Sequence, residues 1–506
     1  MDEFLILKYM QNTNKQENLN TGKSAIALRE EAVLEFWKDN NIFQKTLEKP
    51  VRISEKGGAT DAGEFVFYEG PPTANGKPGI HHLEARSFKD IIPRYKTMRG
   101  YHVSRKGGWD THGLPVELQV EKLLGLKSKK EIEEYGVEAF NKKCKESVWD
   151  YLDMWNSFTA RMGYWVDMQN PYVTYQNSYI EALWGVIGRA NERGHLYKDF
   201  KVLPWCTRCG TALSSHELNQ PGAYKDVKDL SVYVKFKIVG VENGYFMAWT
   251  TTPWTLPGNV GLAVGSDIDY VEAKVGNEVL VVAKERLSVL GEGYEVIAEH
   301  KGSEMVGMQY EPLYPYLSEL LADQKEKGRA SMDTARHDSA ESNAYKVYAA
   351  DFVTTTDGTG IVHIAVMYGA DDFDLGTKYN LPKFHTVNEE GKFINGTGFL
   401  EGRYVKEVDE KGKPTLAVDI IDDLTARGLL FKKENHVHSY PHCWRCDTPL
   451  LYYARSSWYF RMSALRQQLL DANEKINWEP QHIKEGRFGE WLDGIRDWAL
   501  SRDRYW

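Results

Sequence analysis

Two matched cysteine pairs constrain the fold of this 506-residue chain more than any other feature of its sequence. The segments VLPWCTRCGTAL (202–213) and SYPHCWRCDTPL (439–450) share the pattern P-x-C-x-R-C-x-T-x-L. Each resembles a zinc knuckle, in which one turn supplies two thiolates, so Cys206, Cys209, Cys443 and Cys446 together complete a tetrahedral site. The pairs lie much farther apart than the roughly 15–20 residues of a self-contained zinc ribbon. We therefore expect a structural zinc ion to join the two ends of an insertion.

Two other interpretations of these pairs remain. They could be unrelated surface turns, although the matched flanks argue against it. A redox C-x-x-C pair is less favoured, because neither pair opens a helix after a strand.

Length and composition set broad limits on the protein. At about 150 residues per domain, the length predicts roughly three domains. Asp2 and Glu3 stand where a secretory signal would carry basic residues, and no apolar run is long enough to span a bilayer. Of five cysteines, four stand in pairs, which suits a reducing compartment and predicts a cytoplasmic protein. The net charge of −9 excludes a uniformly basic nucleic-acid coat but allows a local basic track.

The first part of the chain predicts a doubly wound α/β domain. An N-terminal arm over residues 1–60, with a helix over Ala25–Asp39, precedes a Rossmann-type parallel-sheet domain whose first part covers 61–200. Glu64–Tyr68 is predicted as a buried strand, followed by a Gly/Pro loop and a helix over His81–Arg99. Such a strand–loop–helix unit binds ligands at the carboxyl end of its strand. The apolar positions of the helix repeat at the helical period at Phe88, Ile91, Ile92, Tyr95 and Met98.

The middle of the chain has the sequence pattern of a separate β-rich domain. Short alternating segments predict a barrel-like domain over 226–436, flanked by zinc-knuckle halves over 201–225 and 437–455. Residues 456–506 are expected to return to the nucleotide-binding domain, which would be incomplete. The polar stretch Gln324–Ala344 is predicted to be a mobile surface loop. The predicted fold class is thus α/β, interrupted by a β-rich insertion.

Two segments carry a family resemblance. FYEGPPTANGKPGIHHLEARSFKD and RGYHVSRKGGWDTHGLPVE closely resemble class I aminoacyl-tRNA synthetases, and within them the isoleucine-specific enzymes. PPTANG and GWDTHGLPVE favour isoleucine over valine or leucine, and the resemblance covers nearly all of the chain after the arm. It implies activation of L-isoleucine with Mg-ATP as substrate, and transfer to tRNA-Ile by an enzyme expected to be a monomer.

The resemblance also implies a synthetic site. Gly70, Pro71 and Asp110 would hold the amino acid, with Asp110 pairing its ammonium group; by itself, Asp110 could equally be a helix cap. Trp458 and Trp498 would wall the side-chain pocket, although as isolated tryptophans they would be assigned to a core. Glu490 is a candidate for the adenylate ribose.

The phosphate-binding signature of the family departs from its usual form. The family has H-x-G-H where this chain has Gly79-Ile80-His81-His82. Gly79, His81 and His82 are therefore the candidate catalytic residues. They stand at the start of a predicted helix whose backbone amides would face the phosphates of ATP. Either the loop is rebuilt so that His81 substitutes for the family's first histidine, which we favour, or activation of the amino acid is slower. The exchange resembles a group of bacterial isoleucine enzymes that tolerate the antibiotic mupirocin, so weak mupirocin binding is expected.

A second, hydrolytic site is also expected. One methylene group in an apolar pocket changes the binding free energy by about 1–3 kcal/mol, a limit for which isoleucine enzymes are themselves the standard case. A pocket for isoleucine therefore cannot exclude valine well, and valine must be removed after it has been attached. The resemblance implies that Thr250, Thr251 and Thr252 line the editing pocket, that His363 contacts the terminal ribose, and that Asp372 binds the ammonium group of misattached valine. The nucleophile would be a positioned water, aided by a ribose hydroxyl of the substrate. Each residue also has an ordinary structural interpretation, as a strand residue, a core histidine or a helix cap.

The chain ends before the K-M-S-K-S loop and the anticodon-binding domain of the family, so we expect a fragment with weak or no aminoacylation. Two alternatives remain open. One is a hydrolase that only deacylates mischarged tRNA, and the other is a non-catalytic tRNA-binding or amino-acid-sensing paralogue.

Overall fold

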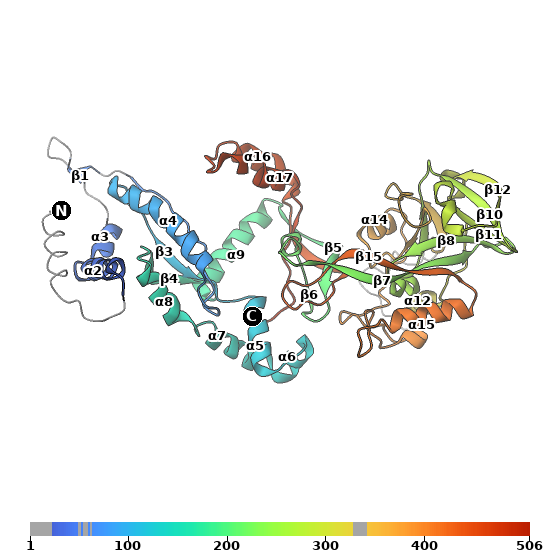
Figure 1. Cartoon of the computed structure of the whole chain (residues 1–506), viewed down its shortest axis with the longest axis horizontal. Coiled ribbons are helices and arrows are strands. Elements are labelled where there is room, and N and C mark those ends of the chain that lie inside the picture. The colour runs from blue at the N-terminus through green and yellow to red at the C-terminus, as the bar shows by residue number, and fades with distance from the viewer. Residues whose placement is uncertain (1–22, 49–51, 54–58, 61–62, 327–341) are drawn as a thin grey trace. The chain divides into compact units, whose positions relative to one another are not determined.

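The structure is a computed structural model and describes residues 23–48, 52–53, 59–60, 63–326 and 342–506. The chain divides into one unit of residues 1–189 with 505–506 and a second unit of residues 190–504 (Figure 1). None of the helices in the described ranges is long and apolar enough to cross a membrane.

The first unit is built mainly from helices. Its described helices are α2 (Ala25–Asp39), α3 (Ile42–Leu47), α4 (Ile80–Met98), α5 (Leu114–Leu124), α6 (Lys129–Tyr135), α7 (Val137–Ser147), α8 (Leu152–Arg161) and α9 (Asn177–Glu192), the last of which crosses into the second unit. β1 (Arg52–Ile53) pairs antiparallel with β2 (Ala59–Thr60), and β3 (Lys106–Trp109) pairs parallel with β4 (Asp167–Val173). The helix predicted over Ala25–Asp39 is confirmed, and Ser24 caps it by accepting a bond from the Ala27 amide at 3.2 Å.

The parallel pairing predicted for the strands of the first domain is present, but the predicted strand over Glu64–Tyr68 is not. Parallel bridges join Glu64 to His102 and Thr73 to Asp110, with no ladder between them. Val66 is 66% exposed and Tyr68 is 88% exposed. A strand buried on both faces needs a covering layer, and the described residues place none over these side chains.

The predicted helix is confirmed as α4, but its apolar stripe is exposed. The residues Phe88, Ile91, Ile92, Tyr95 and Met98 are all exposed. The buried residues of α4 are instead Arg86, Asp90 and Pro93. The helix predicted from this period is therefore correct. The face of α4 that is covered within the described chain, however, is the mostly polar face and not the apolar one.

The described residues of the second unit form three sheets. Its strands are β5 (Leu196–Cys206), β6 (Thr211–Ala212), β7 (Tyr224–Lys237), β8 (Gly244–Thr250), β9 (Gly261–Val264), β10 (Asp269–Val275), β11 (Glu278–Ala283), β12 (Tyr294–Lys301), β13 (Lys346–Ala349), β14 (Ile361–Ile364), β15 (Leu430–Pro441), β16 (Leu451–Phe460) and β17 (Trp498–Ala499). Their orders are β12-β10-β11-β8-β7-β15, β13-β9-β14 and β17-β16-β5-β6.

The largest sheet is open, so the barrel-like form predicted for residues 226–436 is wrong. Its edge strands β12 and β15 do not pair with each other in the described chain. Alternating strands predict a half-buried sheet, but closure depends on strand tilt and stagger, which alternation does not encode. Here the second, three-stranded sheet and several helices cover the apolar face instead of a closing strand.

Helices complete the second unit. They are α10 (Ser215–Leu218), α11 (Gly302–Met305), α12 (Tyr316–Glu326), α14 (Ala370–Lys378), α15 (Leu416–Ala426), α16 (Arg466–Asn473) and α17 (Arg487–Asp493), with the 3-10 helix η1 (Pro253–Gly258) among them. α12 extends into the predicted loop Gln324–Ala344, of which residues 327–341 lie outside the described residues.

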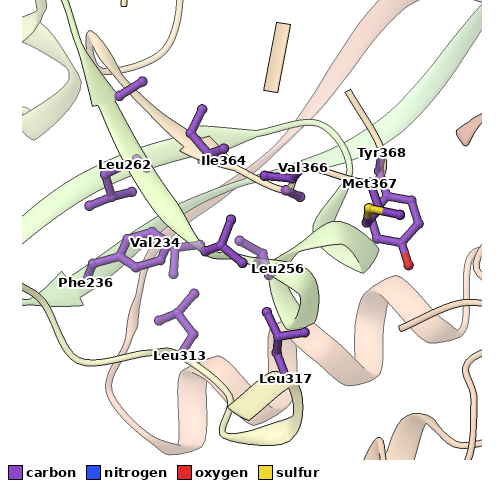
Figure 2. Packing of buried hydrophobic residues seen from close by; sticks show 14 of the residues in the cluster. Val234, Phe236, Leu256, Leu262, Leu313, Leu317, Ile364, Val366, Met367 and Tyr368 are labelled. Carbon is purple, nitrogen blue, oxygen red and sulfur yellow. The ribbon is translucent and has the colours of Figure 1, made fainter. Parts of the chain in front are cut away.

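One apolar cluster joins these elements. Figure 2 shows β7 side chains (Val234, Phe236) gathered with Leu256, Leu262 and Leu317 from η1, β9 and α12. The segment after β14 adds Val366, Met367 and Tyr368 to the same cluster. This packing holds β8, η1 and β14 together, and these elements carry the candidate editing residues.

Candidate functional site

The two cysteine pairs meet because of two long antiparallel ladders. β5, which ends at Cys206, pairs with β16, and β7 pairs with β15, which ends just before Cys443 (Figure 1). The Sγ atoms of Cys206 and Cys209 each lie 3.4 Å from that of Cys446. All four sulfurs lie within 4.8 Å of one another, and theirs is the sole group of three or more potential metal-binding side chains so placed in the described ranges.

The donor set fits zinc. Four sulfurs at about 2.3 Å from a tetrahedral ion stand about 3.8 Å apart, which is compatible with this cluster. Hydrogen bonds, first from the Cys206 thiol and then from Cys209, lower the pKa of Cys446 well below its ordinary value. The hydrogen bonds within the same cluster raise the pKa of Cys206, so the cluster alone does not hold four thiolates, and a bound metal ion would supply that stabilisation.

The turns that present the cysteines have the same shape in both halves. The residue after each second cysteine has a positive φ, 60° at Gly210 and 65° at Asp447. Gly210 donates its amide to the Cys206 carbonyl at 2.8 Å, and Asp447 donates to the Cys443 carbonyl at 2.7 Å. Glycine and aspartate tolerate this left-handed conformation better than most residues, so the sequence match reflects one shared turn.

The candidate amino-acid site in the first unit is partly assembled. The Asp110 amide donates to the Pro72 carbonyl at 3.0 Å, which places the Gly70–Pro71 loop beside the start of the GWDTHG segment. A Cβ on Gly70 would meet no atom within 4 Å, so space is open at this position. Burial raises the pKa of Asp110, an effect opposed by His112 and by hydrogen bonds.

The exchanged signature has a steric explanation. Gly79 precedes α4, and its amide donates to Nδ1 of His82 at 2.9 Å. The His81 and His82 rings lie 3.9 Å apart between centroids, and a Cβ on Gly79 would come within 2.8 Å of the His81 ring. The His81 ring is exposed, so a larger residue at position 79 would displace this ring, whereas Gly79 leaves it in place beside His82.

The state of His82 follows from its surroundings. Burial, then His81 and Arg86, lower the pKa of His82, so the neutral ring is favoured near pH 7. Because Nδ1 accepts the Gly79 amide, Nε2 carries the proton and is the available donor.

The threonines of the candidate editing site form a connected turn between β8 and η1. The Thr252 amide donates to Oγ1 of Thr250 at 3.1 Å, and the hydroxyls of these residues lie 3.2 Å apart. Thr250 is buried, whereas Thr251 and Thr252 are partly exposed. The hydroxyl chain continues from Thr252 to Thr255, whose hydroxyl lies 3.3 Å away.

His363 of β14 is buried, and protein groups bond both of its ring nitrogens. Nε2 lies 2.8 Å from the Thr255 hydroxyl, and Nδ1 lies 3.3 Å from the side-chain amide nitrogen of Asn259. Asn259 also donates to the Gly261 carbonyl and accepts from the Tyr310 hydroxyl at 2.6 Å, which sets its orientation. His363 Nδ1 is therefore the acceptor and Nε2 carries the proton. Burial lowers the pKa of His363 to about 4, so the ring is neutral.

Asp372 joins the same region from α14. Its Oδ2 accepts the amide of Ala365, two residues after His363, at 2.8 Å. Burial raises the pKa of Asp372 to about 7. The structure thus brings the threonine turn and His363 into one network, and it ties Asp372 to the end of the same strand.

Sequence reasoning missed Thr255, Asn259 and Tyr310, which complete this network. Thr255 stands three residues after Thr252, which is a turn spacing, but Tyr310 comes from a distant segment with no motif around it.

The remaining predicted site residues lie in the second unit. Phe460 of β16 pairs with Trp498 of β17, and the Leu500 amide donates to the Trp458 carbonyl at 2.8 Å. Trp458 and Trp498 are thus on adjacent strands, and both are exposed rather than in a core. Glu490 is exposed on α17. Gly70, Pro71, Asp110, Gly79, His81 and His82 belong to the first unit.

Residues 32–506 match the family model described as tRNA synthetases class I (I, L, M and V). The chain belongs to this family. An isoleucine–tRNA ligase of Clostridium tetani is 49% identical over 486 residues, covering 96% of this chain and 43% of its own length. Isoleucine–tRNA ligase 2 of Bacillus cereus (strain ATCC 14579) is 48% identical over 491 residues, covering 97% and 44%. The chain thus spans less than half the length of these synthetases.

A solved structure titled "The crystal structure of GlLeuRS-CP1" is 14% identical and covers 40% of this chain and 98% of its own, with a TM-score of 0.30. At that score the likeness does not establish a shared fold.

Zinc analysis tests the cysteine site. We expect about one zinc per chain in the purified protein, and a clear loss in Cys443→Ser because three sulfurs no longer close the tetrahedron. Cys144→Ser is the control, since Cys144 is buried in a separate cluster. Unchanged zinc content in Cys443→Ser would rule the site out.

The pKa of Asp372 predicts a pH-dependent stability. Folding raises it from 3.8 to about 7, so between these values the native state holds a proton that the unfolded chain has released. The free energy of unfolding of the wild type should therefore fall, relative to Asp372→Asn, as pH rises from 4 to 7, and then level off. Denaturant titrations across this range measure it, with exposed Asp374→Asn as the control. Parallel curves for wild type and Asp372→Asn would contradict the assignment.

Proposed function

We propose that the chain is the activating and proofreading part of an isoleucine–tRNA ligase. In this proposal it activates L-isoleucine with Mg-ATP, transfers it to tRNA-Ile and hydrolyses Val-tRNA-Ile, as a monomer in the cytoplasm. The main support is that one chain of this family carries both a Gly70–Pro71 loop bonded to Asp110 and a buried threonine–histidine network tied to an aspartate.

We assign a part of this function to each segment. Residues 61–200 and 456–506 belong to the catalytic domain and residues 226–436 to the editing domain. Residues 201–225 and 437–455 form the zinc knuckle, and residues 1–60 form the arm. The zinc ion has a structural role, because four sulfurs leave it no position for a water.

In the synthetic site, Asp110 pairs with the ammonium group of isoleucine, and Gly70 and Pro71 keep side chains away from it. Trp458 and Trp498 wall the aliphatic side chain, and Glu490 binds the ribose of the adenylate. The amides at the start of α4 and the Nε2 proton of His82 face the phosphates, where hydrogen-bond donors stabilise developing charge. His81, which Gly79 accommodates, takes the role of the family's first histidine.

In the editing site, Asp372 in its ionised form binds the ammonium group of valine, and Thr250, Thr251 and Thr252 position the water. His363 contacts the terminal ribose as a neutral ring. Because Thr255 and Asn259 hold both of its nitrogens, its role is to shape the pocket rather than to move a proton.

A second candidate function is deacylation alone. Its support is that Thr250, His363 and Asp372 all lie within residues 190–504, apart from the candidate phosphate loop. Isoleucine-dependent exchange of pyrophosphate into ATP by the full-length ligase separates the two, because a pure hydrolase shows none. A chain that neither exchanges pyrophosphate nor deacylates Val-tRNA-Ile would instead be a binding or sensing protein.

Substitutions in the editing site should abolish proofreading. Loss of a charged hydrogen-bond partner is worth about 1.5–3 kcal/mol, so we expect Asp372→Ala to slow Val-tRNA-Ile deacylation by about 10–100-fold. Thr251→Ala should also slow it, because the water loses a positioning group. Release of labelled valine measures the rate, and Asp374→Ala on the same helix is the control. Wild-type deacylation by both variants would refute the editing assignment.

The exchanged signature predicts poor inhibition by mupirocin. We expect weak binding to the full-length ligase, because His81 occupies the position where the family has glycine. Restoring the usual order with the double substitution Gly79→His, His81→Gly should strengthen binding, measured by inhibition of pyrophosphate exchange. Tight binding to the unchanged enzyme would contradict this explanation.

A further inference from the structure

Arg445 stands between the two cysteines of the second pair and is unusually placed for an arginine. Its side chain is only 8% exposed. Among the described residues, its Nε and Nη1 have no hydrogen-bond partner, and Nη2 alone forms an ion pair, with Glu217. The guanidinium carbon lies 4.8 Å from the ring centroid of Trp444. A buried cation with two unpaired donors is costly unless a negative group lies close to it.

The cysteine cluster supplies such a group. Four thiolates around one Zn²⁺ carry a net charge of about −2, and burying that charge also requires compensation. Arg445 directly precedes Cys446 and follows Cys443 by two residues, so its buried guanidinium belongs to the same turn as two of the four sulfurs. Donors near metal-bound thiolates commonly hold such ligands and tune the site.

Glu217 fixes the position of Arg445. Its side chain is 12% exposed, and it accepts bonds from the Ser214 amide at 2.7 Å and the Ser214 hydroxyl at 3.0 Å. The same carboxylate pairs with Arg502 at 3.0 Å. A carboxylate held by four donors in this way cannot easily move, so it orients both arginines.

The connection continues to the end of the second unit. Arg504 donates to the Cys209 carbonyl at 2.8 Å, and Arg502 pairs with Glu217, so segment 498–504 reaches one cysteine turn directly and the other through Glu217 and Arg445. The same segment begins with Trp498 and bonds to the strand that carries Trp458.

We propose that Arg445 is the counter-cation of the four-thiolate metal site, that Glu217 holds it there, and that Glu217 and Arg504 couple the metal site to segment 498–504. The inference rests on the proposed zinc site and deepens it. The metal would then hold the tryptophan wall of the amino-acid pocket as well as the base of the β-rich region.

Zinc release tests the role of Arg445. The variants Arg445→Gln, Arg445→Lys and Glu217→Gln of the whole chain are compared with Arg427→Gln, which removes an ion-paired but exposed arginine outside the cysteine turns. Transfer of zinc to a chelating dye gives the rate. We expect Arg445→Gln to release zinc about 10–100-fold faster than the wild type, as for other losses of metal-supporting groups. Arg445→Lys keeps the charge and should stay within a few-fold, and Glu217→Gln should lie between them.

Hydrogen exchange tests the coupling. Chelation of zinc from the wild type should raise deuterium uptake at Leu500 and its neighbours, because the Leu500 amide loses its fixed acceptor on Trp458.

The outcomes are distinguishable. Release from Arg445→Gln at the rate of Arg427→Gln would overturn the counter-cation role. Equally fast release from Arg445→Lys and Arg445→Gln would show that packing and not charge matters, which also overturns it. Unchanged uptake at Leu500 after chelation would overturn the coupling. A wild-type protein without zinc would instead remove the metal site itself.

Discussion

The pairing of β5 with β16 and of β7 with β15 is the constraint on which the second unit depends. These ladders bring together segments separated by most of the β-rich region and place four sulfurs within 4.8 Å of one another. A metal ion bound by these sulfurs would stabilise the same arrangement that the pairing of the ladders stabilises.

The candidate editing site depends on that anchored region in a different way. Its polar groups are satisfied by one another: Tyr310 holds Asn259, Asn259 and Thr255 hold His363, and Thr255 connects to the threonine turn. Because these groups are buried, each unsatisfied partner would be costly, so the network favours a single geometry. Asp372 is the exception, since burial stabilises its neutral form and a cationic ligand would reverse that preference.

The exchanged phosphate signature shows how two substitutions can depend on each other. Gly79 leaves space that the His81 ring fills, and His82 keeps its position through the Gly79 amide, which any residue other than proline could donate. A larger residue at position 79 alone would displace the His81 ring, and glycine at position 81 alone would remove it. A paired exchange is therefore consistent with a rebuilt loop.

Much of the architecture was encoded locally and could be predicted. The cysteine turns, the helix that became α4 and the alternating strands of residues 226–436 depend on spacing, turn chemistry and period, which are properties of short segments. The family resemblance likewise depended on contiguous motifs. Only the tertiary structure decided that the main sheet stays open, that the apolar face of α4 is exposed, that Glu64–Tyr68 forms no ladder, and that Asn259 and Tyr310 hold His363. These features depend on which distant segments cover a surface or satisfy a buried polar group, and no local pattern records that partner.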